Sequence, residues 1–256
     1  MTSEFVQPSG PGNASGALPE GSEALRAQAN AARDRALELL QLAEFDKALA
    51  AYDEALAHAR AEGDGPFIDW MFACRAAAVV EVGPTDDVLV ELKRILLRAT
   101  DPQTAVRAAH TAASIYELKK DVDKALFYNK LAGQHAERTG DPVLRAHCAN
   151  QLGSLLTTNS RFVEAGEAFA GALRDTEGID AVSPVWRALW KDNLGYCLMV
   201  QDRVKEGLAL AHEALDFLES RSATGHTVFP LLDLCFGYLK IDRFAEARYF
   251  GEEGLD

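Results

Sequence analysis

The chain repeats one pattern of small and large apolar residues about every forty positions. Its two clearest copies run from Leu152 to Ala165, LGSLLTTNSRFVEA, and from Leu234 to Ala247, LCFGYLKIDRFAEA. A third copy begins at Glu44 and reads EFDKALAAY. Apolar residues recur in each copy with helical spacing, and a helix pair with one apolar face buries that face only by stacking on its neighbours. The sequence therefore predicts an all-α, right-handed α-solenoid of about six helix pairs.

The second helix of each predicted pair carries a small or slender residue where the two helices must approach closely. These residues are Ala48, Val88, Ala125, Ala165, Gly207 and Ala247, spaced 37 to 42 positions apart. The next pair starts at a proline after an Asp or Ser, as in Asp101-Pro102, Asp141-Pro142 and Ser183-Pro184. Proline suits the first turn of a helix, and the side chain before it can cap free backbone amides.

The composition divides the chain into a short tail and one long repeat domain. Residues 1–20 are rich in Gly, Pro, Ser and Asn, and they carry too little apolar surface to form a core. We expect a disordered tail over residues 1–20 and the solenoid over residues 21–256, with Ser22 as the first helix cap.

Charge and cysteine usage limit the compartment and the partners. The net charge of −13 argues against binding to nucleic acid or to an anionic membrane surface, since both need clustered Lys and Arg. Residues 1–20 lack the pattern of a signal peptide, and no apolar stretch reaches the roughly 18 residues that span a membrane. None of the four cysteines forms a CxxC pair, which favours reduced thiols in a cytoplasmic protein.

The sequence contains no convincing catalytic or metal-binding motif. The segment from His212 to Asp216, HEALD, begins like the zinc-protease motif HExxH but has Asp in place of the second His. His147 and Cys148 are adjacent, so on a helix they point about 100° apart and do not share a metal easily. We therefore predict a protein that is not an enzyme and that uses no cofactor or metal.

The repeat pattern resembles the tetratricopeptide repeat family, in a long-repeat variant of about 40 residues. The resemblance covers residues 22–256 and is carried most clearly by the fourth copy, in Leu152, Gly153, Phe162 and Ala165. The usual repeat in that family has 34 residues, so this chain has longer helices and loops. The resemblance implies that the first helix of each pair lines a concave groove.

Carrying the groove positions of the family onto this chain gives a row of residues on the first helices, among them Asp192 and Leu232. Eleven residues of this row are the candidate binding residues. They are Arg33, Trp70, Arg107, His110, Ser114, His147, Asn150, Ser154, Tyr196, Phe229 and Phe236. The centre of this set is polar and its C-terminal end is aromatic, which would suit a peptide backbone and an apolar anchor. Phe229 and Phe236 have a second interpretation, in which they pack against their own repeat.

The predicted function is a non-catalytic protein-interaction module that binds a peptide or helix of a partner protein in the groove. One alternative is a regulatory sensor whose curvature responds to a small peptide or ligand. Another is an accessory subunit of an enzyme complex. Exposed aromatic residues near the C-terminal end also allow self-association through that end.

Overall fold

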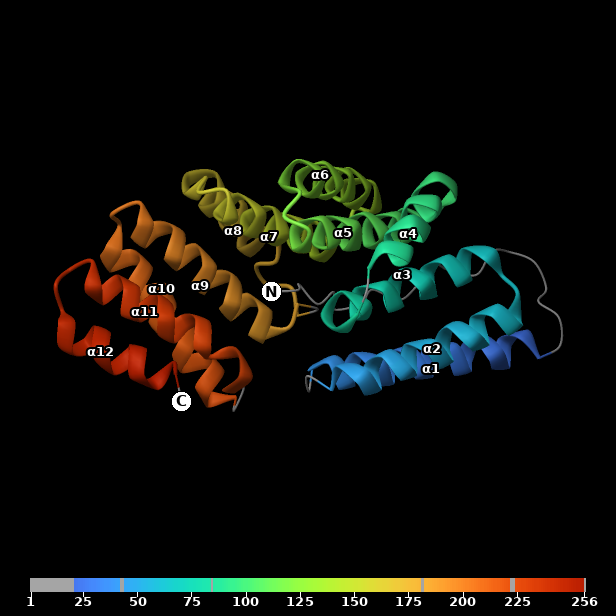
Figure 1. Ribbon diagram of the computed structural model, residues 1–256, viewed down its shortest axis with the longest axis horizontal. Coiled ribbons are helices and arrows are strands. Elements are labelled where there is room, and N and C mark those ends of the chain that lie inside the picture. The colour runs from blue at the N-terminus through green and yellow to red at the C-terminus, as the bar shows by residue number, and fades with distance from the viewer. Residues whose placement is uncertain (1–20, 42–43, 84, 181, 222–223, 256) are drawn as a thin grey trace. The chain divides into compact units, whose positions relative to one another are not determined.

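The computed structural model describes residues 21–41, 44–83, 85–180, 182–221 and 224–255. The predicted tail, residues 1–20, lies outside the described residues. The described part of the chain consists of α-helices, one short 3₁₀ turn and connecting loops, and it contains no strand. The predicted all-α class is thereby confirmed, and the helices form six consecutive pairs (Figure 1).

The first of two compact units, Met1–Gly140, holds three helix pairs. Its helices are α1 (Ser22–Gln41), α2 (Phe45–Glu62), α3 (Gly65–Val82), α4 (Asp86–Arg98), α5 (Pro102–Leu118) and α6 (Val122–Thr139). Successive helices pack against each other from α1 to α6, and α3 also packs on α5. The first helices of neighbouring pairs are therefore in contact within this unit.

The second unit, Asp141–Asp256, holds the other three pairs. Its elements are α7 (Pro142–Thr158), α8 (Phe162–Asp175), α9 (Pro184–Val200), α10 (Val204–Ser220), the 3₁₀ turn η1 (Thr224–His226), α11 (Val228–Leu239) and α12 (Phe244–Glu253). Here α9 packs on both α7 and α11, in addition to α8 and α10. The first helices α7, α9 and α11 thus lie side by side in sequence order.

Of the three Asp or Ser residues that precede a helix-starting proline, two cap their helix with a side-chain hydrogen bond. The Asp101 side chain accepts a hydrogen bond from the backbone N–H of Thr104 at 2.7 Å, and the Asp141 side chain accepts one from Val143 at 2.8 Å. Ser183 makes no side-chain cap bond, although Pro184 begins α9. Each cap satisfies one of the amides that a helix start leaves without a partner.

Four of the six pairs are closed by the same kind of turn. Lys120, Ser160, Asp202 and Asp242 have φ between 57° and 65°, each between the two helices of its pair. The residue after each of them donates its backbone N–H to a carbonyl five residues earlier, as Arg161 does to Leu156 at 2.9 Å. This is a Schellman-type helix end, which reverses the chain within a few residues.

Small residues lie where the second helix of a pair meets the first. Ala48, Ala125 and Ala165 are fully buried, as predicted. One close approach is between α9 and α10, where a methyl group built on Gly195 would lie 2.8 Å from the carbonyl oxygen of Gly207. No residue larger than glycine fits either position without moving a backbone.

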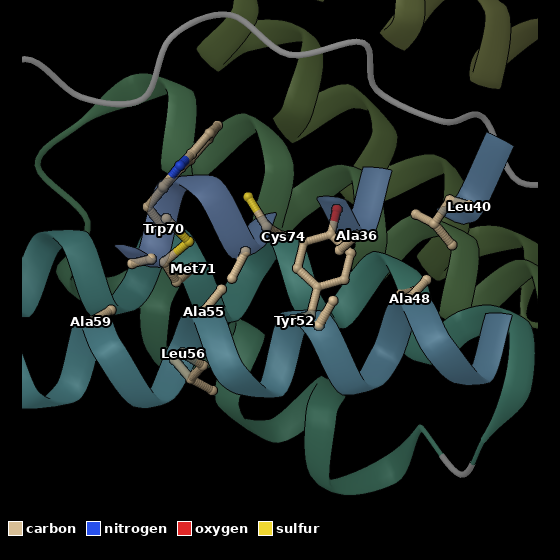
Figure 2. Packing of buried hydrophobic residues seen from close by; sticks show 14 of the residues in the cluster. Ala36, Leu40, Ala48, Tyr52, Ala55, Leu56, Ala59, Trp70, Met71 and Cys74 are labelled. Atoms are coloured by element: carbon tan, nitrogen blue, oxygen red, sulfur yellow. The ribbon is translucent and has the colours of Figure 1, made fainter. Parts of the chain in front are cut away.

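About half of the residues in one continuous core of the first unit are alanine. Side chains from α1, α2 and α3 gather between the helices (Figure 2), and Tyr52, Trp70 and Met71 fill the spaces that the alanines leave. Both Tyr52 and Trp70 are 1% exposed. Alanine lets helices approach closely, so a few large side chains complete the packing.

Candidate functional site

All eleven predicted binding residues lie on the first helix of a pair. Arg33 is on α1, Trp70 on α3, and Arg107, His110 and Ser114 are on α5. In the second unit, His147, Asn150 and Ser154 are on α7, Tyr196 is on α9, and Phe229 and Phe236 are on α11. Most of those on α1, α3, α5 and α7 are buried, whereas those on α9 and α11 are half-buried or exposed.

In the first unit, four of the predicted residues are buried. Trp70 is 1% exposed, and the guanidinium of Arg107 lies 5.1 Å from the centre of the Trp70 ring. His110 on α5 is 3% exposed, while Arg33 forms an ion pair with Asp34 at 2.7 Å. Only Ser114 is half-buried. A role of these residues in partner binding remains a prediction, because burial alone does not test it.

On α7 the predicted residues mostly face inward. His147 and Asn150 are 1% and 9% exposed, and the His147 ring meets the Trp190 ring of α9 edge-on at 5.4 Å. The Thr157 hydroxyl on α7 lies 3.7 Å from the Cys197 sulfur on α9. These two contacts show that this face of α7 packs on α9, and they explain why polar residues there are covered.

The aromatic residues on α9 and α11 form a more open surface. Tyr196 and Phe236 are half-buried, and their ring centres are 5.5 Å apart. Phe229 and Leu232 on α11 are each 43% exposed. Together with two carboxylates they define what we call the α9–α11 surface: Asp192, Tyr196, Phe229, Leu232, Asp233 and Phe236. Phe236 also packs against the core of its own pair, so the interpretation as a core residue holds for part of its side chain.

The two carboxylates of this surface are electrostatically unusual. Asp192 is 1% exposed, and its Oδ1 atom has no hydrogen-bond donor. Loss of hydration, together with the nearby Asp233, raises the pKa of Asp192 to about 9. Burial likewise raises the pKa of Asp233 to about 7. Both groups therefore hold a proton far more readily than an exposed aspartate does.

Asp233 is a residue that the groove positions taken from the repeat family do not include. It is the only charged residue in α11, whose sequence is VFPLLDLCFGYL. A lone carboxylate in such an apolar helix is the signal that could have identified it, because an acid that is neither paired nor solvated is costly to keep. Its neighbour Asp192 occupies a groove position but gives no comparable signal in the sequence.

Other kinds of site find no support among the described residues. No group of three or more His, Cys, Asp or Glu side chains within the described ranges could hold a metal ion. None of the four cysteines, all of them within the described ranges, forms a disulfide, and Cys74, Cys148 and Cys197 are buried. None of the described helices is long and apolar enough to cross a membrane.

Comparison with known proteins identifies the fold. No protein-family model and no curated protein sequence matches the chain. Solved structures do match. The apo form of the quorum sensor NprR from B. thuringiensis is 17% identical with a TM-score of 0.65, over 89% of this chain and 64% of NprR. A Rap protein complexed with competence and sporulation factor is 13% identical with a TM-score of 0.63, over 89% of this chain and 74% of Rap.

A third structure matches only through one part of a larger protein. It is a signal transduction ATPase with a tetratricopeptide repeat sensor from Pyrococcus horikoshii, 14% identical with a TM-score of 0.70. The match covers 91% of this chain but only 34% of the ATPase. At these identities the likeness concerns the fold, and the resemblance seen in the repeat pattern is confirmed at that level. The chain is built on the tetratricopeptide-repeat fold.

Proposed function

We propose that this chain is a non-catalytic interaction module that binds a segment of a partner protein on the α9–α11 surface. The observation that carries the proposal is the row of Phe229, Leu232 and Phe236, spaced i, i+3 and i+7 along one face of α11. Two of these side chains are 43% exposed, although an aromatic or aliphatic group gains free energy on leaving water.

The neighbouring residues make this row suitable for binding a peptide. Tyr196 from α9 meets Phe236 from α11, so the surface spans two helices that pack against each other. Large apolar groups at the centre with polar groups beside them are typical of the anchor regions of protein interfaces. A cytoplasmic location fits this proposal, since the four cysteines, all described, form no disulfide.

The structural neighbours favour a sensor as the second candidate. NprR is described as a quorum sensor, and the repeats of the archaeal ATPase are described as a sensor. In this version of the function, the bound segment is a signal that changes the arrangement of the helices. The two candidates share the binding surface and differ in what binding does.

Selection from a library of random twelve-residue peptides displayed on phage tests the binding surface. The full chain should enrich peptides that bind it, and Phe229→Ser with Leu232→Ser should weaken their binding by tenfold or more, roughly the effect of truncating an interface anchor. Leu97→Ser is the matched control, because Leu97 is 89% exposed on α4, a helix of the other unit. Unchanged affinity in the double variant would place the binding surface elsewhere.

The sensor version makes an additional prediction for any peptide selected in this way. A signal peptide should change the distances between spin labels placed on different helix pairs, whereas a scaffold should bind it without such a change. Label distances that stay constant at saturating peptide would show that binding does not rearrange the helix pairs, which would rule out the sensor and support the scaffold.

A further inference from the structure

The carboxylate of Asp192 is buried without a donor for one of its oxygens. Among the described residues, no hydrogen bond or ion pair engages Oδ1 of Asp192, and Asp192 is 1% exposed. The charged group that influences Asp192 is a second carboxylate, Asp233 of α11, whose negative charge disfavours ionisation of Asp192. A buried acid beside another acid lacks both of the usual forms of compensation, a donor and a cation.

Helix geometry places the two acids next to the aromatic rings. The rings of Tyr196 on α9 and Phe236 on α11 are in contact, and Lys240, just after α11, donates to the carbonyl of Met199 near the end of α9. The contacts advance in the same direction along both helices, so α9 and α11 run parallel. Moving about one turn toward the start of each helix leads from Tyr196 to Asp192 and from Phe236 to Asp233, which lie four and three residues earlier. The pair of acids therefore lies beside the pair of rings, within the α9–α11 surface.

The basic residues of these two helices and the loop that follows α11 are engaged elsewhere. Lys191 pairs with Glu213, and Arg187 donates to the backbone carbonyl of Ile179 at 3.1 Å. Lys240 donates to the carbonyl of Met199 at 2.9 Å and to Asp202 at 2.6 Å. Within the described part of the chain, none of these cations neutralises the two acids.

A buried carboxylate beside a half-buried one can be neutralised by a proton or by a cation that comes from outside the chain. A metal ion is the poorer candidate, because no third His, Cys, Asp or Glu joins the pair among the described residues. A guanidinium or an ammonium group on a flexible side chain needs only the two acids, and aromatic rings stabilise its charge further.

We propose that Asp192 and Asp233 together bind the basic side chain, arginine or lysine, of the partner segment, while Tyr196 and Phe236 flank its stem. The proposal rests on the proposed function, since it names the class of residue that the partner presents to this surface. Charge complementarity supports it, because the whole chain carries a net charge of −13 and would attract a basic segment.

A peptide array provides the first test. Degenerate nine-residue peptides carry one fixed residue at the centre: arginine, lysine, citrulline or norleucine. Citrulline keeps the shape of arginine without its charge, and norleucine keeps the length of the lysine stem. The wild-type chain should be retained about tenfold more strongly by arginine or lysine than by the neutral partner, as expected for a desolvated charge pair.

Variants of the chain complete the array experiment. Asp192→Asn and Asp233→Asn should each abolish the preference for a basic residue, while Asp216→Asn should keep it, because Asp216 is exposed on α10. Retention that does not depend on the fixed residue, or a preference that persists in both variants, would overturn the proposal while leaving the proposed function intact.

A second measurement does not depend on peptide binding. The carboxyl carbon shifts of Asp192 and Asp233 are followed by NMR in the full chain, with N-acetylarginine amide as the probe and N-acetylcitrulline amide as its control. Shifts produced by the arginine compound alone support the cation site even if no peptide binds, in which case only the proposed function fails. Equal or absent responses to both compounds contradict the cation site.

The folding of the variants separates binding from structure. If the acids serve a ligand and not the fold, Asp192→Asn should melt at the same or a higher temperature than the wild type above pH 8, because it removes a buried charge. A fall in melting temperature at that pH would assign Asp192 a structural role and contradict the proposal.

Discussion

Single residues set the turns between paired helices. Lys120, Ser160, Asp202 and Asp242 adopt a left-handed conformation that side chains with a Cβ atom disfavour by roughly 1–2 kcal/mol. None of the four is glycine. The sequence alone does not reveal these positions, because glycine is the residue that normally marks a left-handed helix end.

Replacing one of these residues should therefore stabilise the protein. Ser160 is exposed, with φ of 59°, and Ser160→Gly should raise the free energy of unfolding by roughly 0.5–1 kcal/mol. Urea unfolding followed by circular dichroism measures the change. Glu167→Gly, at an exposed position inside α8, is the opposing control and should lower stability by about 1 kcal/mol. An equal loss of stability in the two variants would show that the backbone at Ser160 is not strained.

The acids on α9 and α11 should give the protein a distinctive pH dependence. Burial raises the pKa values of Asp192 and Asp233 in the folded chain above their ordinary value of 3.8, and the charge of Asp233 raises that of Asp192 further. Their contribution to stability is thus fully present below about pH 4, and it is lost as the pH rises toward the raised values. Stability should fall between about pH 4 and pH 9.

Asp192→Asn should flatten that pH dependence. At about pH 4 the variant and the wild type should be about equally stable, since protonating the buried acid costs little there and the protonated acid resembles asparagine in shape. At pH 9 the variant should be more stable by over about 1 kcal/mol. Urea unfolding at both pH values tests this, and a wild-type curve without such a slope would contradict the burial of charge.

Helices and their pairing follow from the sequence to a large extent. Proline after a capping Asp correctly marks the start of α5 and α7, and the small residues at Ala48 and Ala165 correctly mark close helix contacts. The direction of individual side chains was less predictable. A helix turns 100° per residue, so whether His110 or Asn150 faces outward depends on which neighbouring helix covers it, and that is decided by packing.

The crossing of α9 and α10 should be sensitive to a single methyl group. Gly207→Ala would place a Cβ atom about 3.1 Å from the backbone nitrogen of Met199, and it should destabilise the protein by roughly 1–3 kcal/mol. Gly133→Ala is the matched control on α6, because a Cβ atom there meets nothing within 4 Å. That substitution should stabilise by up to about 1 kcal/mol, because alanine favours the helix. Differential scanning calorimetry should show a lower melting temperature for Gly207→Ala and an equal or higher one for Gly133→Ala.

At the scale of the whole molecule, the chain divides at Gly140 and Asp141. Gly140 ends α6 in a left-handed conformation, and Asp141 caps the start of α7. Each of the two units has its own helix pairs and its own buried clusters. The regular repeat in the sequence gave no sign of this division, because the spacing of the small residues continues across it.

A fragment of residues 141–256 should therefore fold by itself. It should show the far-ultraviolet circular dichroism of a helical protein and a cooperative thermal transition, since its three pairs stack on one another. Unfolding of the full chain should deviate from a two-state transition. A fragment without helical signal would show that the second unit depends on the first.

The recurring left-handed turn has a consequence for how such a chain changes over evolutionary time. The same backbone reversal accepts lysine, serine and aspartate at its strained position, so its geometry does not depend on one particular side chain. Substitutions can then accumulate on the exposed faces of the helices while the frame of each pair is preserved. A frame of this kind allows new ligands to be acquired by changing a few residues between the turns.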